Sequence, residues 1–389
     1  MPDTVHRDPI IALSSPELLL DPYPAYEKLR QERPVFFYDR LNSWIFSRYD
    51  DCIAVLKDSA KFAADWRRVG ERMPPRAINM LTLDPPEHTV VRRLFMDALR
   101  ARGHTDIERV IGDHTAELLT ALERRPSFEF LTEFAEPLAL STTAAYLGVP
   151  APDAAWASRV ARAIVAGMDA GLWPERAKPV LAAQEELAGL VDDWLAHPPP
   201  SGVVASIAKR AAGSGVAPAI IANTVRGLLF SGYSSGSKLL GLVAVALLHQ
   251  RAAELERFRA ADTALAVDEM VRYASPIQAV ARACVHDTEL GGTTVRAGQA
   301  VTLLLGAANR DPARFPDPDT ARLDRHPNPH LGFGRGPKSC LGSPFTAIFT
   351  RVVLRVLAER YPGIRAVSAP TYLPNLTARS IDRFEVALR

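Results

Sequence analysis

The most informative stretch of the chain reads Phe333-Gly334-Arg335-Gly336-Pro337-Lys338-Ser339-Cys340-Leu341-Gly342, just ahead of a helix-like segment at Phe345–Glu359. Its glycines permit φ > 0 and let a flat ligand approach the backbone. N–H groups near a helix start can stabilise a thiolate at Cys340. Such a thiolate suits an axial bond to a metal, onto which it pushes electron density. The alternative is a glycine turn followed by a buried structural cysteine.

The composition is that of a globular protein without an obvious polyanionic partner. The 389 residues include 46 basic and 44 acidic side chains, giving a net charge of +2, and 48% are hydrophobic. This balance is far from that of disordered chains and gives no electrostatic case for nucleic acid. The three cysteines, Cys52, Cys284 and Cys340, are too few and too scattered for a disulfide framework or a four-thiolate iron–sulfur cluster.

Nothing in the sequence predicts secretion or a membrane span. Residues Met1–Pro16 contain charged side chains and no apolar leader segment. The longest strongly apolar run, Leu239–Leu248, is too short to cross a bilayer. We therefore expect a cytoplasmic protein that does not contact membranes.

Periodicity and turn residues predict a mostly α chain with small β-sheets near both ends. Helical signals dominate from Pro86 to Leu248, with amphipathic segments on either side of a break at Gly171–Pro174. A hairpin of Val35–Tyr38 and Trp44–Ser47 is expected near the N-terminus. The other expected elements are helices at Ala25–Arg30, Asp50–Leu56, Pro218–Gln250, Thr263–Tyr273 and Phe345–Glu359, and strands at Thr293–Val295 and Ala300–Leu305.

The pattern Phe-x-x-Gly-x-x-x-Cys-x-Gly around Cys340 resembles the haem-binding loop of the cytochrome P-450 family. The resemblance implies the P-450 fold as a single domain over residues 1–389, with mobile lid helices at about 150–200. It places haem b between the long central helix and the helix that follows the cysteine loop. Cys340 is then the iron ligand, and Phe333, Gly336 and Gly342 border the haem.

A second motif, Glu269-Met270-Val271-Arg272, looks like the family's Glu-x-x-Arg helix. Residues three apart share a helix face, so the two charges can pair. In the family this pair is buried and ties an irregular, proline-marked stretch to the haem-side core. The usual third partner, an Arg or His of that stretch, aligns near Thr320, and Arg322 is the candidate substitute.

Haem carries propionates that need donors when buried. Asp84-Pro85-Pro86-Glu87-His88-Thr89-Val90-Val91-Arg92 is similar to a family segment that supplies His88 and Arg92. Arg282 matches the family's strand arginine, and Lys338 stands where a His or Arg is usual. Each residue alone is also compatible with a solvated cation.

The central helix reads Phe230-Ser231-Gly232-Tyr233-Ser234-Ser235-Gly236-Ser237 in its middle. Interior glycines and serines weaken a helix, so we expect a local opening there, with close packing through small residues as the alternative. The family's usual acid falls at Ser234 and its threonine at Ser235. We therefore expect Ser235 and Ser234 to be the catalytic residues, with Ser235 relaying protons together with water or a substrate group.

The resemblance also implies which segments line a substrate pocket. These are the loop before His88, the central helix, the strand before Arg282 and the C-terminal turn. The expected lining residues are Trp66, Asn79, Met80, Phe230, Tyr233, Gln278, Ala279, Val280, Leu376 and Thr377.

The implied function is haem-thiolate activation of dioxygen and hydroxylation of a small organic molecule in secondary-metabolite biosynthesis. Electrons come from NAD(P)H through a ferredoxin and its reductase, which could dock on a basic patch. The patch residues are Arg92, Arg93, Arg100, Arg102, Arg335 and Lys338. The alternatives are oxidative coupling or ring formation on an aromatic or cyclic-dipeptide-like substrate, use of hydrogen peroxide, and haem binding without turnover.

The expected substrate is therefore a soluble small molecule of secondary metabolism. Insertion of oxygen and oxidative coupling both remain open from the sequence. The serine at position 234 motivates the coupling alternative but does not decide it, because both routes need the same activated oxidant.

Overall fold

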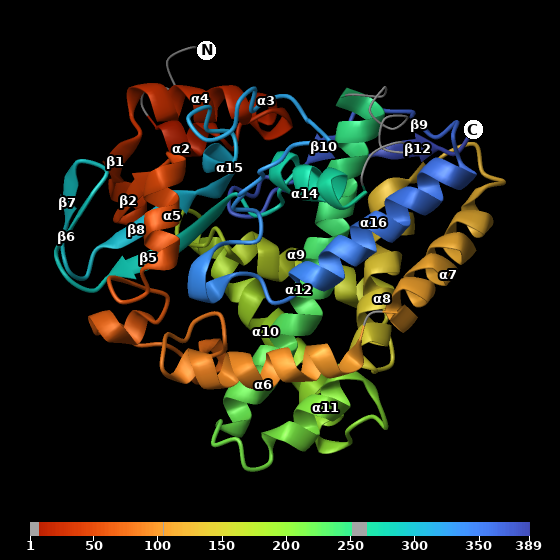
Figure 1. Cartoon of the computed structure of the whole chain (residues 1–389), viewed down its shortest axis with the longest axis horizontal. Coiled ribbons are helices and arrows are strands. Elements are labelled where there is room, and N and C mark those ends of the chain that lie inside the picture. The colour runs from red at the N-terminus through yellow and green to blue at the C-terminus, as the bar shows by residue number, and fades with distance from the viewer. Residues whose placement is uncertain (1–7, 104, 251–262) are drawn as a thin grey trace.

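The computed structural model describes residues 8–103, 105–250 and 263–389, and about 55% of it is helical (Figure 1). This confirms the mostly α class. Residues 1–7 lie outside the described residues. They are part of the segment, Met1–Pro16, in which we expect no apolar leader. The longer helices are α4 (Tyr23–Glu32), α5 (Tyr49–Lys57), α6 (Glu87–Arg102), α7 (Thr105–Leu122), α8 (Glu136–Leu147), α9 (Ala154–Gly167), α10 (Ala177–Ala196), α11 (Gly202–Ala211), α12 (Pro218–Val245), α14 (Thr263–Tyr273) and α16 (Ser343–Arg360).

The largest sheet has five strands in the order β1-β2-β8-β5-β3. The expected hairpin forms its edge, and a single parallel pairing joins β2 to β8. Its strands are β1 (Val35–Tyr38), β2 (Ser43–Phe46), β3 (Phe62–Ala63), β5 (Ala279–Cys284) and β8 (Ala300–Leu304). The smaller sheets comprise β4 (Phe128–Glu129), β12 (Glu385–Ala387) and β9 (Arg365–Ala366), then β10 (Thr371–Tyr372) with β11 (Ile381–Arg383), and β6 (Thr288–Leu290) with β7 (Thr293–Val295).

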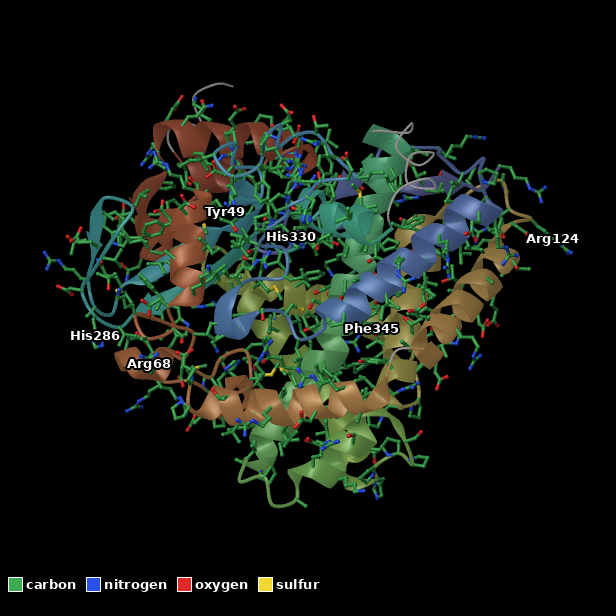
Figure 2. The ribbon with its side chains drawn as sticks, in the orientation of Figure 1. Tyr49, Arg68, Arg124, His286, His330 and Phe345 are labelled. Carbon is green, nitrogen blue, oxygen red and sulfur yellow. The ribbon has the colours of Figure 1, made fainter. Side chains whose placement is uncertain are left out.

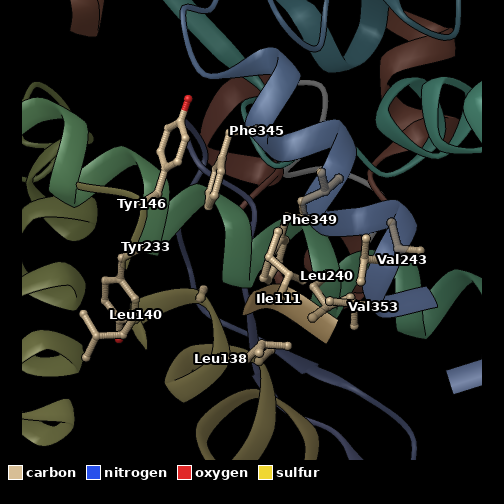
Figure 3. Close-up of a cluster of buried hydrophobic side chains, with 14 of the residues drawn as sticks. Ile111, Leu138, Leu140, Tyr146, Tyr233, Leu240, Val243, Phe345, Phe349 and Val353 are labelled. Carbon is tan, nitrogen blue, oxygen red and sulfur yellow. The ribbon is translucent and has the colours of Figure 1, made fainter. Parts of the chain in front are cut away.

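The main apolar core lies where α12 meets α8 and α16 (Figure 3). Tyr146 of α8 stacks on Phe345 of α16, with ring centroids 4.7 Å apart. Phe349, one turn further along α16, is 1% exposed and contacts the same cluster. Burial of large aromatic side chains is a major source of core stability. This packing fixes the start of α16 against the central helix.

Helix α12 is continuous through Phe230–Ser237, so the expected local opening is wrong. A Cβ built on Gly232 would lie 2.7 Å from Thr143 Cγ2 of α8. The small residue is therefore needed for close helix packing, which was the alternative. The helix and its π-helical continuation, Pro218–His249, are long and apolar enough to span a membrane, but 72% of the tested window is buried inside the protein. That burial is typical of a core helix.

Candidate active site

The cysteine loop joins a short 3-10 turn, Gly336–Lys338, to the start of α16, where Phe345 lies (Figure 2). The Cys340 backbone N–H donates to the Phe333 carbonyl over 2.7 Å, which closes the loop. Cys52 and Cys284 are buried, whereas Cys340 is exposed. Cys340 is therefore not a structural cysteine packed into the core.

The sulfur of Cys340 lies in a partly desolvated position that faces backbone donors. Burial raises the pKa of the thiol, whereas the N–H groups of Gly342 and Ser343 and the charge of Arg92 lower it. A bonded metal ion removes the thiol proton outright. The donors are therefore placed to stabilise a coordinated thiolate.

Two glycines of the loop differ in what a side chain would contact. Gly336 has φ 74°, and a Cβ there would lie 2.5 Å from the Leu56 carbonyl oxygen at the end of α5. The lack of a side chain at Gly336 lets the loop pack closely against the end of α5. A Cβ on Gly342 would lie 3.9 Å from Cys340 Sγ, an ordinary contact distance. A side-chain carbon at position 342 would therefore not crowd the sulfur, and this contact does not explain the glycine.

The expected propionate donors come together beside this loop. The Arg92 guanidinium donates to Ser339 Oγ over 3.2 Å. Lys338 Nζ lies 3.4 Å from an Asp84 carboxylate oxygen and also donates to the Leu83 carbonyl. Arg282 Nη1 donates to the adjacent Ala281 carbonyl over 2.7 Å.

Burial lowers the pKa of Lys338 to about 8, and Arg282 contributes to the decrease. Burial also lowers the pKa of Arg92 and of Arg282. Burial, Lys338 and Arg92 lower the pKa of His88 to about 4, so His88 is neutral near pH 7. His88 is therefore not a cation in the haem-free chain, contrary to expectation. Its neutral ring can still donate a hydrogen bond to a propionate.

These residues fit a flat, dianionic cofactor with an iron centre. Arg92, Arg282 and Lys338 lie in one region together with the buried carboxylate of Asp84. Desolvation disfavours the charged form of each of the three cations. Buried charges require partners, and carboxylates of a bound ligand would provide them. The accessible Cys340 supplies the soft donor for iron. The donor set therefore matches haem.

The Glu269–Arg272 pair is buried, as expected, and each of its two charged hydrogen bonds measures 2.8 Å. The third partner is Arg325, whose Nε lies 3.1 Å from both carboxylate oxygens of Glu269. The expectation for the Arg322 side chain is wrong, because only the backbone N–H of Arg322 reaches Glu269. Thr320 contributes its carbonyl as an acceptor.

On α12, the expected relay residues point in different directions. Ser231 and Ser235 are four apart and share one face of the helix. The Ser234 hydroxyl is instead buried, where it accepts a hydrogen bond from Lys238 Nζ over 2.6 Å. Sequence reasoning did not single out Lys238, although a lysine inside an apolar core helix was a visible signal.

The expected substrate-lining residues do not form one group. Phe230 and Tyr233 line a cavity with Trp156, on the flank of α12 away from Ser235. The Met80 N–H donates to Thr224 Oγ1 over 3.1 Å, and Gln278 Nε2 donates to the Ser275 carbonyl over 2.6 Å.

The other expected lining residues belong to loops or strands. Trp66 begins a 3-10 turn, Asn79 caps a loop turn, and Ala279 and Val280 belong to β5. The N–H groups of Leu376 and Thr377 donate to Asp169 over 2.7 and 3.0 Å. Asp169 thereby anchors the turn between α9 and α10 to the C-terminal turn, a contact that sequence reasoning missed.

Comparison with known proteins gives the family. A family model described as Cytochrome P450 matches residues 263–361, which include Glu269, Arg272 and Cys340. Mycinamicin IV hydroxylase/epoxidase of Micromonospora griseorubida is 31% identical over 334 residues, which are 83% of this chain and 83% of that protein. The polyketide biosynthesis cytochrome P450 PksS of Bacillus subtilis is 26% identical over 390 residues, 95% of this chain and 96% of that protein.

The structural comparison agrees along nearly the whole chain. The crystal structure of CYP109E1 from Bacillus megaterium in complex with testosterone matches with a TM-score of 0.88 and 25% identity, covering 96% of this chain and 100% of that one. The chain therefore belongs to the cytochrome P450 family: it is a monooxygenase-type oxidoreductase that uses haem b and receives electrons from NAD(P)H through redox partners.

Proposed function

We propose that this enzyme hydroxylates a small molecule of secondary metabolism, and that the Cys340 thiolate would hold the haem iron. The observation that carries the proposal is the exposed Cys340, which faces the N–H groups of Gly342 and Ser343 beside clustered cations. The names of the two relatives, a mycinamicin IV hydroxylase/epoxidase and a polyketide biosynthesis enzyme, support the substrate class.

Bound haem supplies the oxygen-activating chemistry, and the chain supplies its binding and surroundings. Arg92, Arg282 and Lys338 would hold the propionates by charge-assisted hydrogen bonds, and His88 would be a neutral donor. Ser235, on the same face of α12 as Ser231, offers a hydroxyl through which water can pass a proton. We further propose one domain over the whole chain, with α9 and α10 as a lid anchored by Asp169.

The spectrum of the reduced, carbon-monoxide-bound protein tests the cysteine assignment. The wild type reconstituted with hemin should show the thiolate-ligated Soret band, and Cys340→Ala should lose it. Cys52→Ala is the matched control, because it makes the same substitution at a buried cysteine of α5. Retention of the thiolate band by Cys340→Ala would refute the proposal.

Oxidative coupling without oxygen insertion is the second candidate. It is favoured by the engagement of Ser234 with Lys238 in place of the usual acid. Turnover under ¹⁸O-labelled dioxygen separates the two reactions. Label in the product supports hydroxylation, whereas an unlabelled dimer or ring-closed product supports coupling.

We also propose a ferredoxin as the electron donor and a cytoplasmic location. Arg93 and Arg100 of α6 are exposed and support docking of an acidic protein by charge complementarity. Lys338 is turned inward to Asp84, with 8% of its side chain exposed, so it does not extend that basic patch.

A further inference from the structure

A small polar cavity lies beside α12 on the flank that carries Ser234 and Lys238. Its water-accessible volume is about 10 Å³, roughly enough for one water molecule. Glu136 at the start of α8 and Arg162 of α9 complete its charged wall. Arg162 pairs with Asp382 of β11 over 3.3 Å, and their side chains are 38% and 41% exposed. The charged wall therefore extends to solvent.

Polar and charged groups of α8, α9 and α12 surround this cavity. Lys238 Nζ donates to the Ser234 hydroxyl over 2.6 Å and to the Ser234 carbonyl over 3.3 Å. Glu136 lines the same cavity and attracts the Lys238 ammonium electrostatically. Burial lowers the pKa of Lys238 to about 8, with Glu136 opposing the decrease and Arg162 adding to it. Lys238 can thus release a proton near neutral pH.

We propose that Glu136 supplies the carboxylate that α12 lacks at Ser234, and that Lys238 links Glu136 to the proton path of the active site. A proton leaves Lys238 Nζ for the Ser234 hydroxyl, which releases its own proton to water. Because Ser234 and Ser235 lie on different faces of α12, water must carry that proton to the face of Ser235. Glu136 returns a proton to Nζ through water in the cavity and regains one from solvent. This inference rests on the proposed function, and both residues act through Ser234, so they are positioning residues.

Turnover by two routes tests the role of Glu136. With NADPH and a surrogate ferredoxin system, Glu136→Gln should lower product formation about tenfold or more and increase the solvent isotope effect. Hydrogen peroxide reduces the need for delivered protons, so the peroxide-driven rate should change less than twofold. Glu117→Gln, on the exposed side of α7, is the matched charge control. An equal loss by both routes, or an unchanged isotope effect, would overturn the inference.

A spectroscopic measurement tests Lys238 without turnover. The C–O stretching band of the carbon-monoxide complex should shift with pH near 8 in the wild type. The shift should vanish in Lys238→Met and remain, at a different pH, in Glu136→Gln. A shift that persists unchanged in Lys238→Met overturns the inference. If the wild type binds haem but is inactive by both routes, the proposed function is contradicted instead. The pH dependence of the C–O band then still tests the connection between Lys238 and the active site.

Discussion

Arg325 Nε lies 3.1 Å from both carboxylate oxygens of Glu269, each of which also accepts a hydrogen bond from Arg272. One buried carboxylate thus serves two buried guanidinium groups. The remaining Arg325 donors bond to the carbonyls of Pro316, Asp317 and Thr320. Since these acceptors all lie in the proline-marked stretch, the three charged groups hold a segment without regular secondary structure against α14.

Removal of Arg325 should destabilise the fold strongly. Arg325→Met removes one of the two guanidinium partners of the buried Glu269 carboxylate, at a cost of about 3 kcal/mol or more. Arg322→Met is the control, since its side chain is 45% exposed and its backbone N–H still reaches Glu269. We expect the control to change the free energy of unfolding by about 0.5 kcal/mol or less. Urea unfolding measures both, and equal losses would contradict the assignment of Arg325.

The sequence predicted the helices, the hairpin and the Cys340 loop because each has a local signal. Proline marks the start of α12, and glycines mark the loop before α16. The identity of Arg325 had no such signal, since no helix or strand fixes the register of the irregular stretch. The direction of Ser234 was also missed, because a one-residue step turns a helix by about 100° and places neighbours on different faces.

Loss of Arg282 should weaken haem binding more than folding. Arg282 donates to the Ala281 carbonyl, and burial disfavours its charge until an anion is present. Arg282→Gln should therefore release hemin to an acceptor protein about tenfold faster. Arg296→Gln is the control, because Arg296 is 74% exposed in the following hairpin. An unchanged release rate for Arg282→Gln would remove Arg282 from the propionate site.

Gly336 should tolerate no side chain. Gly336→Ala adds a clash with the Leu56 carbonyl to the cost of a positive φ. Gly298→Ala is the matched control, because its φ is 84° and nothing lies within 4 Å of the added Cβ. The control should cost about 1 kcal/mol, and Gly336→Ala should cost more and slow hemin uptake. Equal unfolding free energies for the two variants would show that the loop shifts to avoid the Leu56 carbonyl at no measurable cost.

Charge reversal on α6 should affect reduction by a ferredoxin. Arg93→Glu together with Arg100→Glu should lower the association rate about tenfold at low salt, and the deficit should shrink as salt screens the contact. Arg109→Glu on α7 is a control for a general change of surface charge. Stopped-flow reduction at several salt concentrations measures the effect. Unchanged rates and salt dependence would exclude this face as the docking site.

Lys238 should give the haem-free protein a distinctive pH dependence of stability. Burial lowers the pKa of Lys238 from its ordinary value of 10.5 to about 8 in the folded chain. Between these values the unfolded chain holds a proton that the folded chain has released, so the free energy of unfolding rises with pH. The difference between the two pKa values limits this rise to about 3 kcal/mol. Below pH 8 both states are protonated and the contribution is constant.

Urea unfolding of the wild type and of Lys238→Met from pH 7 to pH 10 measures this contribution. The wild type should gain stability relative to the variant as pH rises, because the variant has no ammonium at this position. Lys178→Met removes an exposed lysine of α10 and should keep the wild-type dependence. Tyr233 does not titrate early in the folded chain, since burial raises its pKa above the usual range. Parallel curves for the wild type and Lys238→Met would show that the lysine is solvated, and the route through Ser234 would lose its proton source.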